Sequence, residues 1–121
     1  MANILIIDDH RETSLALVRL FNSSGHSAHW ESSGAEALRY VRTAKPDFVL
    51  LDFMMPDMDG LDTLRKLRGT PTTAHVPITI YTAVSDGKFR EFAMECGATD
   101  VWTKGQFDFN HMLERLNKTV H

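Results

Sequence analysis

Three features that are scarce in this 121-residue sequence each exclude a class of protein. There is one cysteine, Cys96, so no disulfide can form within the chain, which indicates a reducing compartment and predicts a cytoplasmic location. Positive charge is not in excess, because 13 Lys and Arg stand against 16 Asp and Glu, and we expect no binding to nucleic acid or to an anionic membrane. No apolar run approaches the length of a membrane span, and the first one ends at Asp8 without the cleavage site of a signal peptide.

Repeats, low-complexity tracts and linkers are also missing, so nothing in the sequence divides the chain into separate units. The hydrophobic share of 43% is that of an ordinary globular protein, and 121 residues are enough to bury a hydrophobic core. We therefore predict one domain over residues 1–121.

Short apolar runs alternate with segments of helical periodicity along the chain. The runs predict buried strands at 3–7, 47–53 and 78–82, a weaker strand at 26–31 and a fifth at about 100–103. Apolar residues recur at helical spacing in five other segments: 11–22, 34–44, 61–69, 89–97 and 109–119. Because alternating strands and helices pair through right-handed crossovers, the sequence predicts an α/β fold: a doubly wound five-stranded parallel sheet with helices on both faces.

Polar side chains lie at or just after the carboxyl ends of four of the predicted strands. They are Asp8 and Asp9 after the first, Asp52 at the end of the third, Thr82 on the fourth and Lys104 after the fifth. The carboxyl ends of parallel strands share one edge, so we expect these side chains to converge. Two like charges about 4 Å apart repel by roughly 4 kcal/mol at an effective dielectric near 20, and one lysine does not offset three carboxylates. The set therefore predicts a divalent cation, and its oxygen ligands favour Mg²⁺.

Each of these residues also has an ordinary structural explanation when it is considered alone. An Asp after a strand often caps a helix or forms a turn, which applies to Asp52 and to the pair Asp8-Asp9. Thr82 suits a strand, and Lys104 suits a solvated surface. The six histidines show no spacing typical of a zinc site. The functional interpretation depends on the whole set meeting at one edge.

The set has the parts required for covalent phosphoryl transfer. An Asp carboxylate can act as a nucleophile and form an aspartyl phosphate, and Asp52 is the candidate for this role. The cation, the ammonium of Lys104 and the hydroxyl of Thr82 would neutralise the oxygens of the transferred group.

In their order and separations, these residues resemble the receiver domain of two-component response regulators, of the chemotaxis-regulator type, over essentially the whole chain. The matching pieces are Asp8-Asp9, Asp52-x-x-Met55-Pro56-x-Met58-Asp59-Gly60, Thr82-Ala83, and Lys104 after Gly97-Ala98. The resemblance implies the flavodoxin-like strand order 2-1-3-4-5. It also implies a signalling module in a phosphorelay and not an enzyme.

The resemblance assigns a role to each residue of the set. Asp52 is expected to accept a phosphoryl group from a histidine kinase or a histidine phosphotransfer protein. Mg²⁺ is expected to bind Asp9, Asp52 and the backbone carbonyl of Met54 directly, and Asp8 through water. The phosphoryl oxygens are expected to be held by Thr82 and Lys104. A downstream protein is then expected to bind the surface formed by the fourth helix, the fifth strand and the fifth helix.

Two departures from the family pattern lie near Lys104. Gly105 stands where the family usually has a proline after a cis bond; because a cis bond before a non-proline residue costs about 3 kcal/mol, we predict a trans Lys104–Gly105 bond. Val101 stands where the family has its switch aromatic, and Trp102 lies beside it. A switch region of Thr82, Val101 and Trp102 is therefore expected to respond to phosphorylation differently or weakly.

A third departure is Glu31, where the family usually has a small apolar residue, and it predicts a second strand that is distorted or lies at the edge of the sheet.

Two other functions stay open. One is an interaction module that no longer uses phosphate, which the unusual segment at 101–105 favours and the complete acid, hydroxyl and lysine set opposes. The other is a small Mg²⁺-dependent phosphohydrolase with Asp52 as nucleophile, which the short chain opposes because it lacks room for a substrate-specificity domain.

Overall fold

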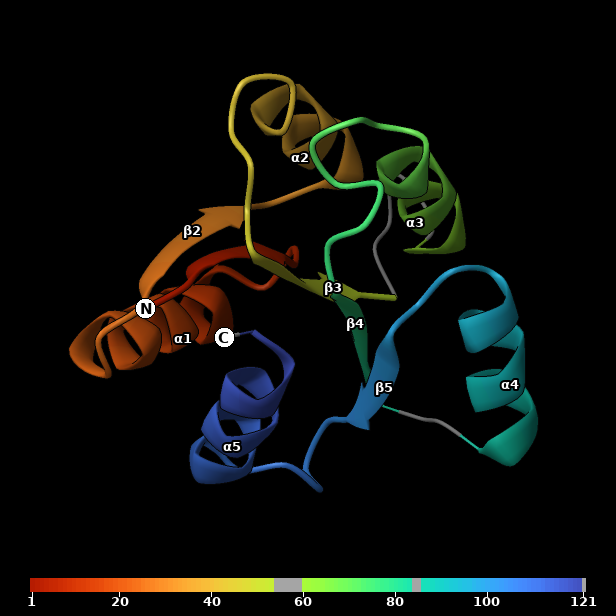
Figure 1. Ribbon diagram of the computed structural model, residues 1–121. Helices are drawn as coiled ribbons and strands as arrows, with labels where there is room; N and C mark the ends of the chain where they lie inside the picture. Colours follow the sequence, from red (N-terminus) through yellow and green to blue (C-terminus); the bar gives the residue numbers. More distant parts are fainter. Residues whose placement is uncertain (54–59, 84–85, 121) are drawn as a thin grey trace.

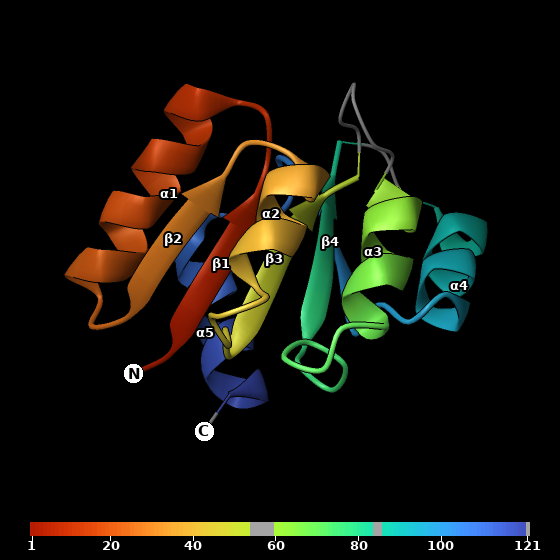
Figure 2. The same cartoon turned by 90° about the horizontal axis from the view of Figure 1, so that it is seen from above.

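The predicted strands form one parallel sheet in the computed structural model, which describes residues 1–53, 60–83 and 86–120. The strands are β1 Asn3–Ile7, β2 Ser27–Glu31, β3 Phe48–Asp52, β4 Ile78–Thr82 and β5 Asp100–Thr103. They lie in the order β2-β1-β3-β4-β5, which confirms the predicted order. Figure 2 shows β2, β1, β3 and β4 side by side, and all four neighbouring pairs of the sheet are parallel.

Helices between the strands form a layer on each face of the sheet. They are α1 Arg11–Ser23, α2 Gly34–Tyr40, α3 Gly60–Arg68, α4 Gly87–Glu95 and α5 Phe109–Thr119. Helices α1 and α5 cover one face, and α2, α3 and α4 cover the other (Figure 1). The doubly wound α/β fold is therefore confirmed. Within the described ranges, no helix has the length and apolar character needed to cross a membrane.

Side chains along each strand point alternately to the two faces of the sheet, so the hydrophobic core has one part on each face. In β1, Leu5 and Ile7 pack with the α2–α4 layer, whereas Ile4 and Ile6 pack with α1 and α5. Every residue of β3 is buried because this strand is central and both of its faces are covered. Strand β2 lies at the edge and ends at Glu31, so the predicted edge position is confirmed. Its pairing with β1 is regular throughout, so of the two predicted alternatives the structure shows the edge position and not the distortion.

The second helix is shorter than the sequence predicts. It ends at Tyr40 and not at Ala44, and residues 41–43 form turns. Here the helical hydrogen bonds give way to tighter ones, since the N–H of Arg42 donates to the Arg39 carbonyl and that of Thr43 to the Tyr40 carbonyl. The chain then reaches β3 through Asp47, whose N–H donates to the Asn3 carbonyl at 2.7 Å.

Asp100, at the start of β5, joins this strand to the two helices beside it. Its carboxylate accepts hydrogen bonds from Arg90 of α4 at 2.9 Å, from Arg115 of α5 at 2.7 Å, and from the indole N–H of Trp102 at 3.1 Å. The backbone N–H of Val101 donates to it as well. Burial raises the pKa of Asp100, but these four hydrogen bonds outweigh it and hold the pKa below the ordinary value of 3.8.

We predict that Asp100→Asn lowers the free energy of unfolding by roughly 1 kcal/mol at pH 7, because an amide loses the charge-assisted bonds to the two arginines. A depressed carboxyl pKa stabilises the fold above the unfolded pKa, and that stability is lost as the pH falls through the folded pKa. The difference between wild type and variant, measured by urea unfolding, is therefore expected to shrink from about pH 4 downward. A difference that is constant between neutral and acidic pH would contradict this.

Candidate functional site

Three residues of the predicted set meet at the carboxyl edge of the sheet. Residues Ile7 of β1 and Leu51 of β3 are paired, so the next residues, Asp8 and Asp52, lie side by side. Both carboxylates are almost completely buried, each residue being 2% exposed. The ammonium Nζ of Lys104 lies 3.6 Å from Oδ1 of Asp52 and 3.8 Å from Oδ2 of Asp8. The predicted convergence of these three side chains is confirmed.

A histidine that the sequence analysis overlooked joins the same cluster. Nδ1 of His10 lies 2.9 Å from Oδ1 of Asp8, 3.2 Å from Oδ1 of Asp9 and 3.8 Å from Oδ2 of Asp52. The hydrogen bond to Asp8 and then the charges of Asp8 and Asp9 raise the pKa of His10. A search for zinc-type spacing among histidines misses it, whereas its position directly after the Asp pair is the signal that finds it.

These four side chains offer a donor set for a metal ion. One ligand atom from each of Asp8, Asp9, His10 and Asp52 lies within 4.8 Å of the others. Asp9 brings the partly exposed carboxylate, with 31% of its side chain accessible, so the cluster opens to solvent on that side. The predicted backbone ligand, the carbonyl of Met54, lies outside the described residues.

Lys104 is positioned by two contacts and by the glycine that follows it. Its backbone N–H donates to the Thr82 carbonyl at 2.7 Å, and its ammonium lies 5.2 Å from the centre of the Tyr81 ring. The Lys104–Gly105 bond is trans, as predicted. Gly105 has a φ of 87°, which proline cannot adopt because its ring fixes φ near −65°. This loop conformation therefore requires a residue other than the family's proline.

Gly60, the first residue of α3, lies very close to the backbone of Phe53. Its N–H donates to the Phe53 carbonyl at 3.1 Å, and a Cβ on Gly60 would lie only 2.6 Å from Cα of Phe53. Glycine thus lets the start of α3 pack directly against the residue that follows Asp52.

The three residues of the predicted switch region lie on different sides of the sheet. Thr82 ends β4 and is 3% exposed. Val101 is buried in the layer of α2, α3 and α4, whereas Trp102 faces the opposite layer, where its ring stacks on Phe48 and Phe107. Because neighbouring strand residues point to opposite faces, Trp102 does not take the place of an aromatic at 101.

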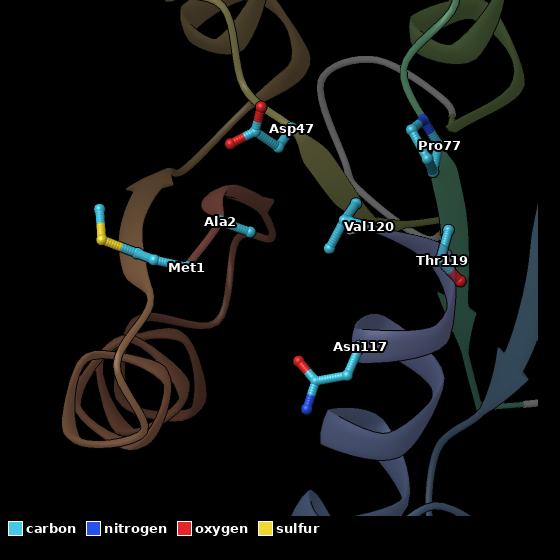
Figure 3. A pocket seen from close by; sticks show the side chains of 7 residues that line it. All are labelled: Met1, Ala2, Asp47, Pro77, Asn117, Thr119 and Val120. Carbon is cyan, nitrogen blue, oxygen red and sulfur yellow. The ribbon is translucent and has the colours of Figure 1, made fainter.

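One hollow lies at the opposite end of the strands, away from the acidic cluster. It has a volume of about 680 Å³ and is lined by seven residues: Met1, Ala2, Asp47, Pro77, Asn117, Thr119 and Val120 (Figure 3). Its one acid, Asp47, already accepts a hydrogen bond from the Asn3 N–H at 2.8 Å. The hollow therefore brings together none of the predicted site residues.

Comparison with known proteins agrees with this geometry. The family described as the response regulator receiver domain matches residues 4–117. The chain belongs to this family. The response regulator PleD of Caulobacter vibrioides is 39% identical over 107 residues, which cover 85% of this chain and 23% of PleD. The response regulator MprA of Mycobacterium tuberculosis is 35% identical over 113 residues, covering 93% of this chain and 48% of MprA.

The fold also matches a solved receiver-type structure. The chemotaxis protein CheY4 of Vibrio cholerae superposes with a TM-score of 0.92 at 23% identity, covering 99% of both chains. This receiver domain spans less than half the length of PleD and MprA. Receiver domains are signalling modules of two-component systems: they receive phosphoryl groups from histidine kinases and generally bind Mg²⁺ at an acidic site.

Proposed function

We propose that this receiver domain is a phosphorylatable switch whose phosphoacceptor is Asp52. One observation carries the proposal: the buried carboxylate of Asp52 lies beside that of Asp8, with the Lys104 ammonium within 3.8 Å of both. In the reaction, an oxygen of Asp52 attacks the phosphorus of a phosphohistidine, the P–N bond breaks, and the histidine nitrogen leaves with the bonding electron pair. The donor is a histidine kinase or a histidine phosphotransfer protein.

The other site residues stabilise the charge of the transferred group. The acidic donor set fits Mg²⁺, which Asp9, Asp52 and the carbonyl of Met54 would hold directly and Asp8 through water. When bound, Mg²⁺ neutralises phosphoryl oxygens. Lys104, already beside Asp52, moves little to reach these oxygens, and the hydroxyl of Thr82 donates to another.

The readout surface is the side of the domain formed by α4, β5 and α5. It offers apolar side chains to a partner, since Phe92 is 45% and Met94 39% exposed on α4. Asp100 of β5 forms ion pairs with Arg90 of α4 and Arg115 of α5. A shift of one of these elements therefore moves the other two. Because Val101 replaces the usual aromatic, we expect this shift to be small. We expect the downstream partner to be a protein and not nucleic acid. We expect the interaction to take place in the cytoplasm.

The geometry favours the switch over the module that no longer uses phosphate. The unusual segment at 101–105 was the reason to consider that module, yet the Lys104 ammonium within it still lies 3.6 Å from Asp52. The chain therefore keeps the charge needed for phosphoryl transfer despite the changed loop.

Transfer from phosphohistidine tests the donor class. A histidine kinase and a histidine phosphotransfer protein, each carrying ³²P on histidine, are mixed with this chain and with Asp52→Asn. We expect label to move to the wild type and not to the variant. Uptake from small donors without uptake from any phosphohistidine protein would contradict the proposed donor. Release of many phosphates per chain from a small phosphate ester would favour the phosphohydrolase.

Tyr81 provides a further test, because its ring helps to place the Lys104 ammonium. We predict that Tyr81→Leu slows phosphorylation by acetyl phosphate about fivefold, the equivalent of a cation–π contact of about 1 kcal/mol. Tyr81→Phe keeps the ring and is expected to keep the rate. Equal rates in the leucine and phenylalanine variants, followed by mass spectrometry over time, would show that the ring has no such role.

A further inference from the structure

The imidazole of His10 is directed into the acidic cluster although the residue lies at the exposed start of α1. The backbone N–H and the ring Nδ1 of His10 both lie 2.9 Å from the same oxygen, Oδ1 of Asp8. These two contacts fold the ring back over the cluster, even though 61% of the side chain stays accessible. The ring is therefore held beside three carboxylates, where its nitrogen is a candidate metal ligand.

The spacing of the donor atoms suits simultaneous binding to one ion. Ligands at right angles around an ion at about 2.1 Å lie about 3.0 Å apart, and opposed ligands lie about 4.2 Å apart. Nδ1 of His10 lies 3.2 Å from Asp9 and 3.8 Å from Asp52, both within that interval. One ion can therefore contact the imidazole and these two carboxylates with small adjustments of the side chains.

His10 and Lys104 use different oxygens of the two buried carboxylates. His10 is close to Oδ1 of Asp8 and Oδ2 of Asp52, whereas Lys104 is close to Oδ2 of Asp8 and Oδ1 of Asp52. The imidazole and the ammonium thus approach the pair of carboxylates from different directions. A cation on the His10 side leaves the Lys104 side open for a phosphoryl group.

We propose that His10 is a ligand of the cation held by Asp9 and Asp52, which makes this a mixed oxygen and nitrogen site. The proposal rests on the cation site of the proposed function. Imidazole nitrogen suits first-row transition metals, whereas Mg²⁺ prefers oxygen ligands. His10 therefore raises the affinity for ions such as Mn²⁺ and Ni²⁺ relative to Mg²⁺, beyond the difference that the carboxylates alone produce.

Metal titration without any phosphoryl donor tests this. Dissociation constants for Mg²⁺, Mn²⁺ and Ni²⁺ are measured by calorimetry on the wild type, His10→Ala and the matched control His111→Ala, which removes an exposed histidine of α5. We expect His10→Ala to weaken Ni²⁺ binding about tenfold or more while changing Mg²⁺ binding less than twofold. The control variant is expected to match the wild type. Equal loss for Ni²⁺ and Mg²⁺, or no loss for either, would overturn the proposal.

A spectroscopic readout separates direct ligation from an indirect effect. Pulsed electron paramagnetic resonance on the Mn²⁺-loaded wild type is expected to show ¹⁴N coupling from a bound imidazole, absent in His10→Ala; its absence in the wild type overturns the proposal. Intact mass after acetyl phosphate is measured separately. A chain that takes up phosphate but shows no ¹⁴N coupling refutes the role of His10 alone. A chain that shows the coupling but takes up no phosphate refutes the phosphorylation alone.

Discussion

Replacing Asp52 with asparagine is expected to abolish phosphoryl uptake while making the fold more stable in the absence of a divalent cation. The amide cannot act as the nucleophile, so uptake is lost completely. In the folded state, Asp52 lies beside the like-charged Asp8 and Asp9, and the single ammonium of Lys104 does not offset three carboxylates. Burying the charged carboxylate also costs desolvation free energy. The neutral, isosteric amide of asparagine avoids this cost.

We therefore predict that Asp52→Asn raises the free energy of unfolding by about 1–2 kcal/mol in a buffer with a chelator, measured by urea denaturation. Adding Mg²⁺ is expected to stabilise the wild type by mass action and to have little effect on the variant, because the variant has lost a ligand. If the variant is less stable than the wild type with chelator present, the carboxylate of Asp52 stabilises the fold, and the prediction is wrong.

Arg68→Ala is expected to cause a large loss of stability without touching the site. The guanidinium at the end of α3 donates to backbone carbonyls on two separate loops, at 2.8 Å to Gly97, 3.0 Å to Thr73 and 2.6 Å to Val76. It also lies 3.3 Å from the hydroxyl of Thr99. Burial lowers the pKa of Arg68, yet a guanidinium stays charged at any working pH.

Truncation to alanine leaves these partly buried carbonyls without their donor, and we predict a loss of about 3 kcal/mol in the free energy of unfolding. Arg68→Lys is expected to recover only part of it, because an ammonium lacks the planar, multidirectional donors of a guanidinium. The neighbouring exposed residue offers a control, and Arg65→Ala is expected to change stability by less than about 0.5 kcal/mol. A loss below 1 kcal/mol for Arg68→Ala in chemical denaturation would contradict the account.

The sheet and the central site residues were predictable because their signals are local and strong. Buried parallel strands are continuous apolar runs, and Asp8, Asp52 and Lys104 follow such runs directly. The convergence of their side chains then follows from the rule that parallel strands share a carboxyl edge. Helix ends were less predictable: α4 begins two residues before the expected Phe89, because the Asp86 side chain accepts from the Phe89 N–H and caps the first turn.

Contacts that depend on the direction of side chains could not be predicted from the sequence. His10 was set aside because histidines were judged by their spacing from one another and not by the carboxylates next to them. The support of Lys104 by the Tyr81 ring requires knowledge of how β4 and β5 pair, which periodicity does not contain. The hydrogen bonds of Arg68 join loops far apart in sequence, and no local pattern predicts them.

Intact mass after incubation with acetyl phosphate tests the central claim most directly. The wild type and Asp52→Asn are each incubated with the donor, with Mg²⁺ and with a chelator. We predict that the wild type gains the mass of one phosphoryl group with Mg²⁺ and none with chelator, and that the variant gains none in either condition. A gain of equal size in the variant would place the acceptor elsewhere, and no gain in the wild type would contradict the account of this domain as a switch phosphorylated on Asp52.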